Sequence, residues 1–264
     1  MKRPPPCGWR LLLLAVYALC ALAVWLGWLA GDSNLPQAGL ESMAPSADAL
    51  LGTDHLGRDV LSLLIQGTRT AFTIGVLAAL IAIAGGATLG AIGGYAGRRL
   101  DSALLWLAGA FTAVPGIVLV LIVAFALGAG VFQTAIAIGI GGWVGTYRLA
   151  RAEVMRLRNQ AFIEAAKLAG CSSWRIVWHH LGPNLMPLCR TQFSLYFVYA
   201  IKVEVVVSFL GLGTGALPSW GSIIAHAGTD LPNGVWWPMT AATIALAGLV
   251  LALQSDAAVN GDHA

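Results

Sequence analysis

The chain has 264 residues, of which 58% are hydrophobic and only 10% are charged, with a formal net charge of +3 and a mean hydropathy of +0.78. Soluble globular domains carry about 25% charged residues, so the composition excludes a water-soluble domain and indicates an integral membrane protein. It also excludes a nucleic-acid-binding module, which needs a basic face on a soluble domain. The four cysteines show no C-x-x-C spacing, so we expect free thiols and no metal site.

Residues 1–31 are predicted to form a cytoplasmic N-terminus and the first transmembrane helix. Lys2, Arg3 and Arg10 precede an uncharged run over 11–31. This run is longer than the apolar core of about 7–15 residues in a cleaved signal peptide, so we expect a retained span. The basic residues place the N-terminus in the cytoplasm.

Residues 32–69 are predicted to form the longest external loop, because their acidic residues outnumber their basic ones. The loop contains the string LGTDHLGRDVLS over 51–62, which is typical of a Gly/Asp turn that leads into a short amphipathic helix. His55 follows Asp54 directly, and we interpret the two as a solvated pair rather than as metal ligands.

Residues 70–254 are predicted to hold five further transmembrane helices. The uncharged stretch over 102–147 is too long for one span and right for two, with a hinge at Gly128-Ala-Gly130. The last two spans are expected over 186–212 and 235–253, and residues 255–264 form a tail. Asp54 then lies on the external side of the membrane, whereas Arg98 and Arg151 lie on the cytoplasmic side.

Three residues within the predicted spans are candidates for the transport pathway or its gate. Pro115 bends the third span, and both a packing kink and a pathway-lining bend remain open interpretations. Lys202 and Glu204 lie in the fifth span, where charged side chains usually face a partner or a water-filled cavity. They are two residues apart on a helix and so do not face each other.

The segment over 148–185 is predicted to be cytoplasmic because six basic residues oppose two acidic ones. The basic residues are Arg148, Arg151, Arg156, Arg158, Lys167 and Arg175. Glu164, Ala165 and Ala166 are followed by Gly170 and, thirteen residues later, by Pro183.

This pattern predicts two short helices that are joined at Gly170, which can take a positive φ. Ser172 or Ser173 can cap the second helix, and Pro183 either stops it or opens the next span. Such an exposed, rigid piece suits docking into a groove on another protein. His179 and His180 are interpreted as loop surface.

The spacing E-A-A-x-x-x-G with a proline beyond it resembles the EAA loop of permease subunits of binding-protein-dependent ABC importers. The resemblance implies that Glu164, Ala165, Ala166, Gly170 and Pro183 belong to a coupling loop seated on a cytoplasmic ATPase subunit. The alternative is an ordinary helical hairpin between two spans. The preceding run, Trp143-Val-Gly-x-x-Arg148-x-x-Arg151-x-Glu153, is similar to the family's approach to this loop.

The external string resembles the G-T-D-x-L-G-R-D-V-L-S signature of the dipeptide, oligopeptide and nickel permeases. Its signature residues in this chain are Gly52, Asp54, Gly57, Arg58 and Asp59. The same subfamily has a glutamate before S-F-L-G-L-G and a P-S-W-G after it, as over 204–221 here. The resemblance covers about 51–253.

The chain departs from the family pattern in two places. Trp106 and Gly109 stand where the family commonly has an arginine and an aspartate, which puts the polar contacts of the third span in doubt. The usual G-D-x-L-R-D-x-L-D-P tail is replaced over 254–264, and we expect weaker cytoplasmic contacts from this change.

The resemblance implies an all-α polytopic membrane protein with about six transmembrane helices and the fold of a type I ABC importer permease. It implies a pathway for peptides or similar small solutes, with nickel or metal chelates as a variant, that works by alternating access. The implied partners are a homologous second permease subunit, two ATP-binding subunits, an extracytoplasmic solute-binding protein and the lipid bilayer. The implied location is the bacterial inner membrane with both ends cytoplasmic.

ATP and magnesium are expected in the partner ATPase, and no cofactor or metal is expected in this chain. A phosphate-binding G-x-x-x-x-G-K-[ST] loop is missing, because Lys2, Lys167 and Lys202 are the only lysines and none follows a glycine. The chain is therefore expected not to be an enzyme. Two alternatives stay open: a membrane-embedded enzyme that uses His55 or Glu204, and a structural scaffold. Co-purification of an ATPase discriminates them from an importer subunit.

Overall fold

The computed structural model describes residues 8–29 and 35–261, and their regular elements are helices. In chain order they are α1 (Gly8–Trp25), α2 (Val60–Tyr95), α3 (Arg98–Ala113), α4 (Gly116–Leu127), α5 (Val131–Leu157), α6 (Ala161–Leu168), α7 (Ser173–Arg175), the π-helix η1 (Ile176–Leu181), α8 (Gly182–Phe209), α9 (Trp220–Asp230), the 3-10 turn η2 (Leu231–Asn233) and α10 (Trp237–Gly261).

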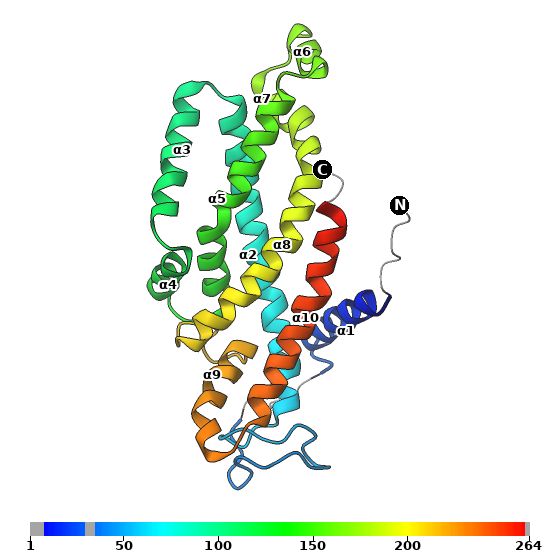
Figure 1. The fold of residues 1–264 in the computed structure, drawn as a ribbon, viewed down its shortest axis with the longest axis vertical. Helices are drawn as coiled ribbons and strands as arrows, with labels where there is room; N and C mark the ends of the chain where they lie inside the picture. The colour runs from blue at the N-terminus through cyan, green and yellow to red at the C-terminus, as the bar shows by residue number, and fades with distance from the viewer. Residues whose placement is uncertain (1–7, 30–34, 262–264) are drawn as a thin grey trace.

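The long helices α2, α5, α8 and α10 run along the long axis of the molecule (Figure 1). The loop over 35–59 and α9 lie at one end, whereas α6 and α7 lie at the other. α1 crosses obliquely and packs against α2 and α10, where the Tyr17 hydroxyl donates a hydrogen bond to the Ala245 carbonyl. The two signature regions of the sequence therefore occupy opposite ends of one bundle.

Helices α2 and α5 pack closely because α2 presents glycines at four-residue intervals. A Cβ atom on Gly86, Gly90 or Gly94 would come within 2.5–2.8 Å of a backbone carbonyl of α5. Small residues at this spacing let membrane helices approach backbone to backbone. These three glycines therefore let α2 and α5 pack with their backbones in close contact.

Helix α2 begins at Val60 and continues to Tyr95, so the short helix predicted after the external turn and the next span are one helix of 36 residues. Asp59 caps its N-terminus by accepting hydrogen bonds from the backbone and hydroxyl of Ser62 at 2.9 and 2.6 Å. The turn over 51–59 is thereby fixed directly to α2, the longest helix of the bundle.

The third predicted span is broken rather than bent at Pro115. Helices α3 and α4 meet at an angle of 89°, with Val114 and Pro115 between them. Pro115 cannot donate a backbone hydrogen bond, and the residue before a proline disfavours the helical region. The predicted hinge at Gly128–Gly130 is confirmed, since α4 ends at Leu127, Gly128 has φ +83° and α5 begins at Val131.

Helices α7, η1 and α8 form one continuous helical run over Ser173–Phe209. The second of the two short helices predicted around Gly170 is therefore not short, and Pro183 opens α8 rather than stopping its predecessor. The wider π turn accommodates the proline, and the Asn184 side chain donates to the His180 carbonyl at 2.6 Å.

By length and apolar composition, two helices in the described ranges could cross a membrane: Val60–Tyr95 and Ser173–Phe209. The bent pair of α3 and α4 makes a third if it is counted as one span, and Leu12–Trp25 and Trp237–Leu253 are shorter apolar helices. An all-α polytopic membrane fold is confirmed, while the count of six spans stays a prediction.

Candidate functional site

At one end of the bundle, α6 carries three of the predicted coupling residues and packs one side against the rest of the molecule. Ile163 and Ala166 are buried against the hydrophobic cluster that includes Val154 and Ile176. Glu164 and Ala165 are exposed. Burial of one side therefore holds α6 in place while the other side remains free for a partner.

Gly170 ends α6 in the predicted way. It has φ +77°, and its backbone N–H donates to the Lys167 carbonyl while the N–H of Cys171 donates to the Ala166 carbonyl. These paired bonds are the Schellman motif, which glycine favours because it has no Cβ to strain at positive φ. Ser172 then caps α7 by accepting from the backbone of Arg175 at 3.4 Å.

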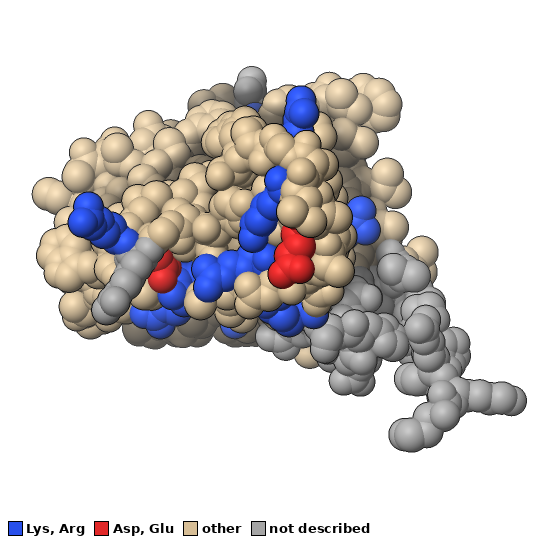
Figure 2. Space-filling model, turned by 90° about the horizontal axis from the view of Figure 1, so that it is seen from above, with Lys and Arg blue, Asp and Glu red and all other residues tan. Residues whose placement is uncertain are grey.

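This end of the molecule is positively charged. Figure 2, which looks down on it, shows Lys and Arg side chains in a band across the face with few acidic groups between them. Two of the acidic groups are occupied within the chain: Asp101 pairs with Arg151 at 2.5 and 2.6 Å, and Glu153 pairs with Arg156 at 2.5 and 2.9 Å. Hydrogen bonds from Arg156 hold the pKa of Glu153 below its usual value. Glu164, by contrast, makes no ion pair within the described residues.

Apolar side chains are also exposed around α6. Leu168 is 89% exposed and Trp174 is 68% exposed, and the rings of Trp174 and Trp178 lie 5.2 Å apart. Large exposed apolar groups beside charged ones are typical of a protein interaction site. The end that carries α6 thus has the composition of a docking surface.

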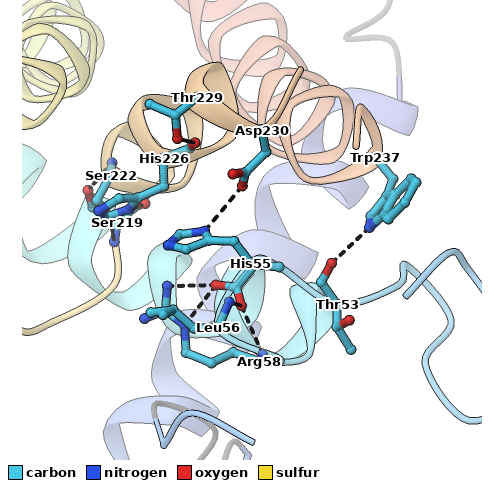
Figure 3. A network of polar contacts seen from close by, with 11 residues as sticks. Thr53, His55, Leu56, Arg58, Ser219, Ser222, His226, Thr229, Asp230 and Trp237 are labelled. Atoms are coloured by element: carbon cyan, nitrogen blue, oxygen red, sulfur yellow. Dashed lines mark hydrogen bonds and ion pairs between the residues drawn. The ribbon is translucent and has the colours of Figure 1, made fainter. Parts of the chain in front are cut away.

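At the opposite end, the signature turn is built by its own residues (Figure 3). One carboxylate oxygen of Asp54 accepts from the backbone of Leu56 and Arg58, and the other binds the Arg58 guanidinium at 2.6 Å. Gly52 and Gly57 have φ of +72° and +74°, and a Cβ on either would overlap the carbonyl oxygen of Met43 or of Gln37 respectively. The signature residues therefore specify a turn.

The turn also contacts α9 and the start of α10, as Figure 3 shows. His55 Nδ1 lies 3.1 Å from Asp230 of α9, and its ring lies 5.5 Å from that of His226. The Trp237 indole donates to the Thr53 carbonyl at 2.9 Å. The interpretation of His55 and Asp54 as a pair was wrong, because Asp54 is taken by Arg58 and His55 by Asp230.

Glu204 is buried, with 1% of its surface exposed, whereas Lys202 is exposed on another side of α8. The Ser208 hydroxyl donates to Glu204 at 2.6 Å, and the Ser219 hydroxyl donates to Ser208 at 3.3 Å. Ser219 is the N-cap of α9. Glu204 thus belongs to a polar chain that joins α8 to α9, and it does not line an open surface.

Two glycines of the S-F-L-G-L-G and P-S-W-G strings allow close packing between α8, the loop that follows it and α9. A Cβ on Gly221 would lie 2.7 Å from the Cα of Val205, and one on Gly213 would overlap the Ser208 hydroxyl. The Trp220 indole is buried and donates to the Leu64 carbonyl of α2 at 3.1 Å. The S-F-L-G-L-G and P-S-W-G strings are therefore a helix-packing device.

A third feature is an open groove between α3, α5 and α8, halfway between the two ends. Its volume is about 430 Å³. The lining residues are Thr112, Gly141, Gly142, Val144, Gly145, Arg148, Gln192, Leu195, Tyr196 and Tyr199. Arg148 donates to the Thr112 hydroxyl at 3.3 Å. Pro115 is exposed at the start of α4 and does not line this groove.

The predicted residues therefore fall into separate places. The five coupling residues lie on or beside α6 and the start of α8, and the five external residues form one turn, while Lys202, Glu204 and Pro115 do not come together. The sequence analysis missed Asp230 as the partner of His55, Asp101 as the partner of Arg151, and the chain of contacts that joins Glu204, Ser208 and Ser219. The first two have no local signal because they join residues far apart in the chain, whereas Glu204 and Ser208 are four residues apart on one helix, a spacing that brings side chains together.

Helix α3 carries the departures from the family pattern on an open surface. Trp106 is 75% exposed, and a Cβ on Gly109 would meet no atom within 4 Å. The polar contacts expected from an arginine and an aspartate at these positions are therefore not replaced by packing within the described chain.

Comparison with known proteins identifies the relatives of this arrangement. The profile of a family described as "Binding-protein-dependent transport system inner membrane component" matches residues 86–258. A dipeptide transport system permease protein of Bacillus subtilis is 34% identical over 198 residues, which are 75% of this chain and 62% of that protein. A putative peptide transport system permease protein of Brucella suis is 34% identical over 247 residues, which are 92% of this chain and 81% of that protein. A glutathione transport system permease protein of Pectobacterium atrosepticum is 30% identical over 221 residues, 83% of this chain and 73% of that protein.

Proposed function

Because the chain belongs to the family of binding-protein-dependent transport system inner membrane components, we propose that it is the permease subunit of an ATP-driven importer for peptides or similar small solutes. The relatives whose names mention a substrate are described as transporting dipeptides, oligopeptides, di/tripeptides or glutathione. All of these solutes carry a peptide bond and a free carboxylate, so a short peptide is the substrate class that we propose here.

The observation that carries the proposal is the state of α6. Its buried side fixes it to the bundle, its Schellman turn fixes its end, and Glu164 is left exposed among basic and apolar side chains. A helix held in this way can transmit a push from a partner without bending. In the proposed complex, α6 docks on one of two ATP-binding subunits, which hold the ATP and magnesium.

The remaining partners follow from the two ends of the molecule. A homologous second permease subunit would cover the open side of α3 and complete the pathway, and an extracytoplasmic solute-binding protein would deliver the peptide at the end of the signature turn. In this arrangement the end with α6 faces the cytoplasm, since basic residues gather there.

The test is co-purification together with uptake. The tagged chain, solubilised from its native membrane, is expected to co-purify with an ATP-binding subunit. Proteoliposomes that contain the complex, with the binding protein added outside, are expected to accumulate a radiolabelled dipeptide only when ATP is enclosed in the vesicle lumen. A chain that purifies alone and supports no uptake would instead favour an enzyme or a scaffold.

A further inference from the structure

We propose that the groove between α3, α5 and α8 binds the C-terminal carboxylate of a passing peptide through Arg148. The inference rests on the proposed function as a peptide importer and adds to it a site within this chain. The guanidinium of Arg148 is the group that would recognise the carboxylate.

Arg148 lacks the carboxylate that its neighbours on α5 have. Arg151 is paired with Asp101 and Arg156 with Glu153, but the bond that Arg148 makes in the described chain is to the neutral hydroxyl of Thr112. The lining of the groove contains no aspartate or glutamate. A guanidinium that donates only to a neutral hydroxyl keeps further N–H groups with which it can bind an anion, and since no acidic side chain lines the groove, we infer that this anion comes from outside the chain.

The rest of the groove matches a peptide better than it matches a lipid phosphate. Gln192 and Tyr199 line it, and their side-chain amide and hydroxyl make no hydrogen bond within the described residues. These groups can bind the backbone N–H and C=O of a peptide, whereas the acyl chains of a lipid would leave them unpaired. A carboxylate can also accept two parallel hydrogen bonds from a guanidinium, which fixes its orientation.

Gly145 gives the groove an open place on α5, since a Cβ there would meet no atom within 4 Å. The space over the other two glycines of the lining is occupied, over Gly141 by Val120 and over Gly142 by Tyr196. At Gly142 a Cβ would overlap the Tyr196 hydroxyl, which donates to the Ile138 carbonyl at 2.8 Å. Glycine at 142 therefore lets Tyr196 lie directly against α5, where it forms one side of the groove.

The experiment measures occupancy of the groove by thiol protection in the assembled importer. Gly145→Cys is introduced into a chain whose four native cysteines are replaced by serine, because position 145 has open space for a side chain. The rate of maleimide labelling is then measured with no peptide, with dialanine and with dialanine amide, which lacks the carboxylate. Dialanine is expected to slow labelling about tenfold more than the amide, as for the gain of one charged hydrogen-bonding partner.

Arg148→Gln is expected to abolish the difference between dialanine and its amide, and Arg148→Lys to retain part of it. The matched control is Arg190→Gln, which removes an exposed cation from α8 outside the groove. Equal protection by both ligands, or protection that survives Arg148→Gln, would overturn the assignment. A thiol that is blocked before peptide is added would also overturn it, because a partner subunit then fills the groove.

Uptake of radiolabelled dialanine by the same complexes separates this site from the function. If the parent complex imports dialanine but shows no carboxylate-dependent protection, the groove assignment fails while the importer function stands. If the parent complex imports no peptide, the proposed function fails whatever the labelling shows.

Discussion

Glu164 is an exposed acidic residue in a basic region, and its carboxylate has no partner in the described chain. We expect that it meets a basic group of the ATP-binding subunit, because Ala165 beside it is small and lets a partner approach. Truncating one member of a buried interfacial pair costs about 2–5 kcal/mol. Glu164→Ala should therefore release the ATP-binding subunit or uncouple ATP hydrolysis from transport, without lowering the amount of permease in the membrane.

The control for this variant is Glu153→Ala. Glu153 lies in the same basic region but is already paired with Arg156, whose side chain is 63% exposed, and exposed pairs contribute about 0–1 kcal/mol. Solute-stimulated ATPase activity in reconstituted complex should fall for the first variant and stay near the parent value for the second. Identical behaviour of both variants and the parent would make Glu164 a solvated surface charge.

Gly170 is constrained by its backbone rather than by its surroundings. Its φ is +77°, and a Cβ there would meet no atom within 4 Å, so any loss on substitution comes from strain at positive φ. A residue with a Cβ pays about 1–2 kcal/mol there, and asparagine less. Gly170→Val should reduce co-purification of the ATP-binding subunit while membrane insertion stays intact, and Gly170→Asn should recover most of it. Full complex formation by the valine variant would mean that the turn is not required for docking.

At the scale of elements, the packing of α9 against α8 predicts opposite effects of the same substitution at two positions of α9. Gly221→Ala places a methyl group 2.7 Å from the Val205 Cα, and overpacking of this kind costs about 1–3 kcal/mol. Gly228→Ala meets no atom within 4 Å and gains about 0.5–1 kcal/mol of helix preference. In detergent, the thermal midpoint should fall for the first variant and stay equal or rise for the second. A fall of equal size in both would show that α9 is not held as described.

At the scale of the whole molecule, the separation of the two ends predicts which side of the membrane each one faces. Asp48 is exposed in the loop before α2, and Arg175 is exposed beside α6. In intact cells of a cysteine-free chain, a membrane-impermeant maleimide should label Asp48→Cys and should fail to label Arg175→Cys until the membrane is opened. These positions suit the test better than Asp54 and Arg151, which are engaged in ion pairs. The reverse labelling pattern would contradict the orientation.

The sequence predicts the parts of this molecule that depend on local chemistry. The hinge at Gly128–Gly130 and the turn at Gly170 follow from glycine's freedom at positive φ, and the fold class follows from hydropathy. The cap at Asp59 has a local signal too, with Ser62 three residues on, which would have placed the start of α2.

Other features depend on which residues meet across the bundle. His55 and Asp230 are 175 residues apart, and no spacing links them. The burial of Glu204 could not be predicted from the sequence of α8, because α8 carries apolar residues around most of its circumference. The spacing of these residues therefore does not mark one face of the helix as the buried one. The broken third span had a signal in Pro115, but the angle between α3 and α4 depends on packing.

The unbroken run of helix over Ser173–Phe209 has a mechanical consequence. Its 37 residues form a rod of about 55 Å, with the neighbourhood of α6 at one tip and Ser208, which touches the cap of α9, near the other. Tilting such a rod by about 5° about one tip sweeps the other by about 5 Å, comparable to one helical turn. The π turn of η1 and the prolines at 183 and 187 lie close to the tip beside α6, so the helical run is most flexible near that tip and the remaining length is stiff. In the proposed complex, a small movement of an ATP-binding subunit at the tip beside α6 would in this way become a larger movement at the tip beside α9.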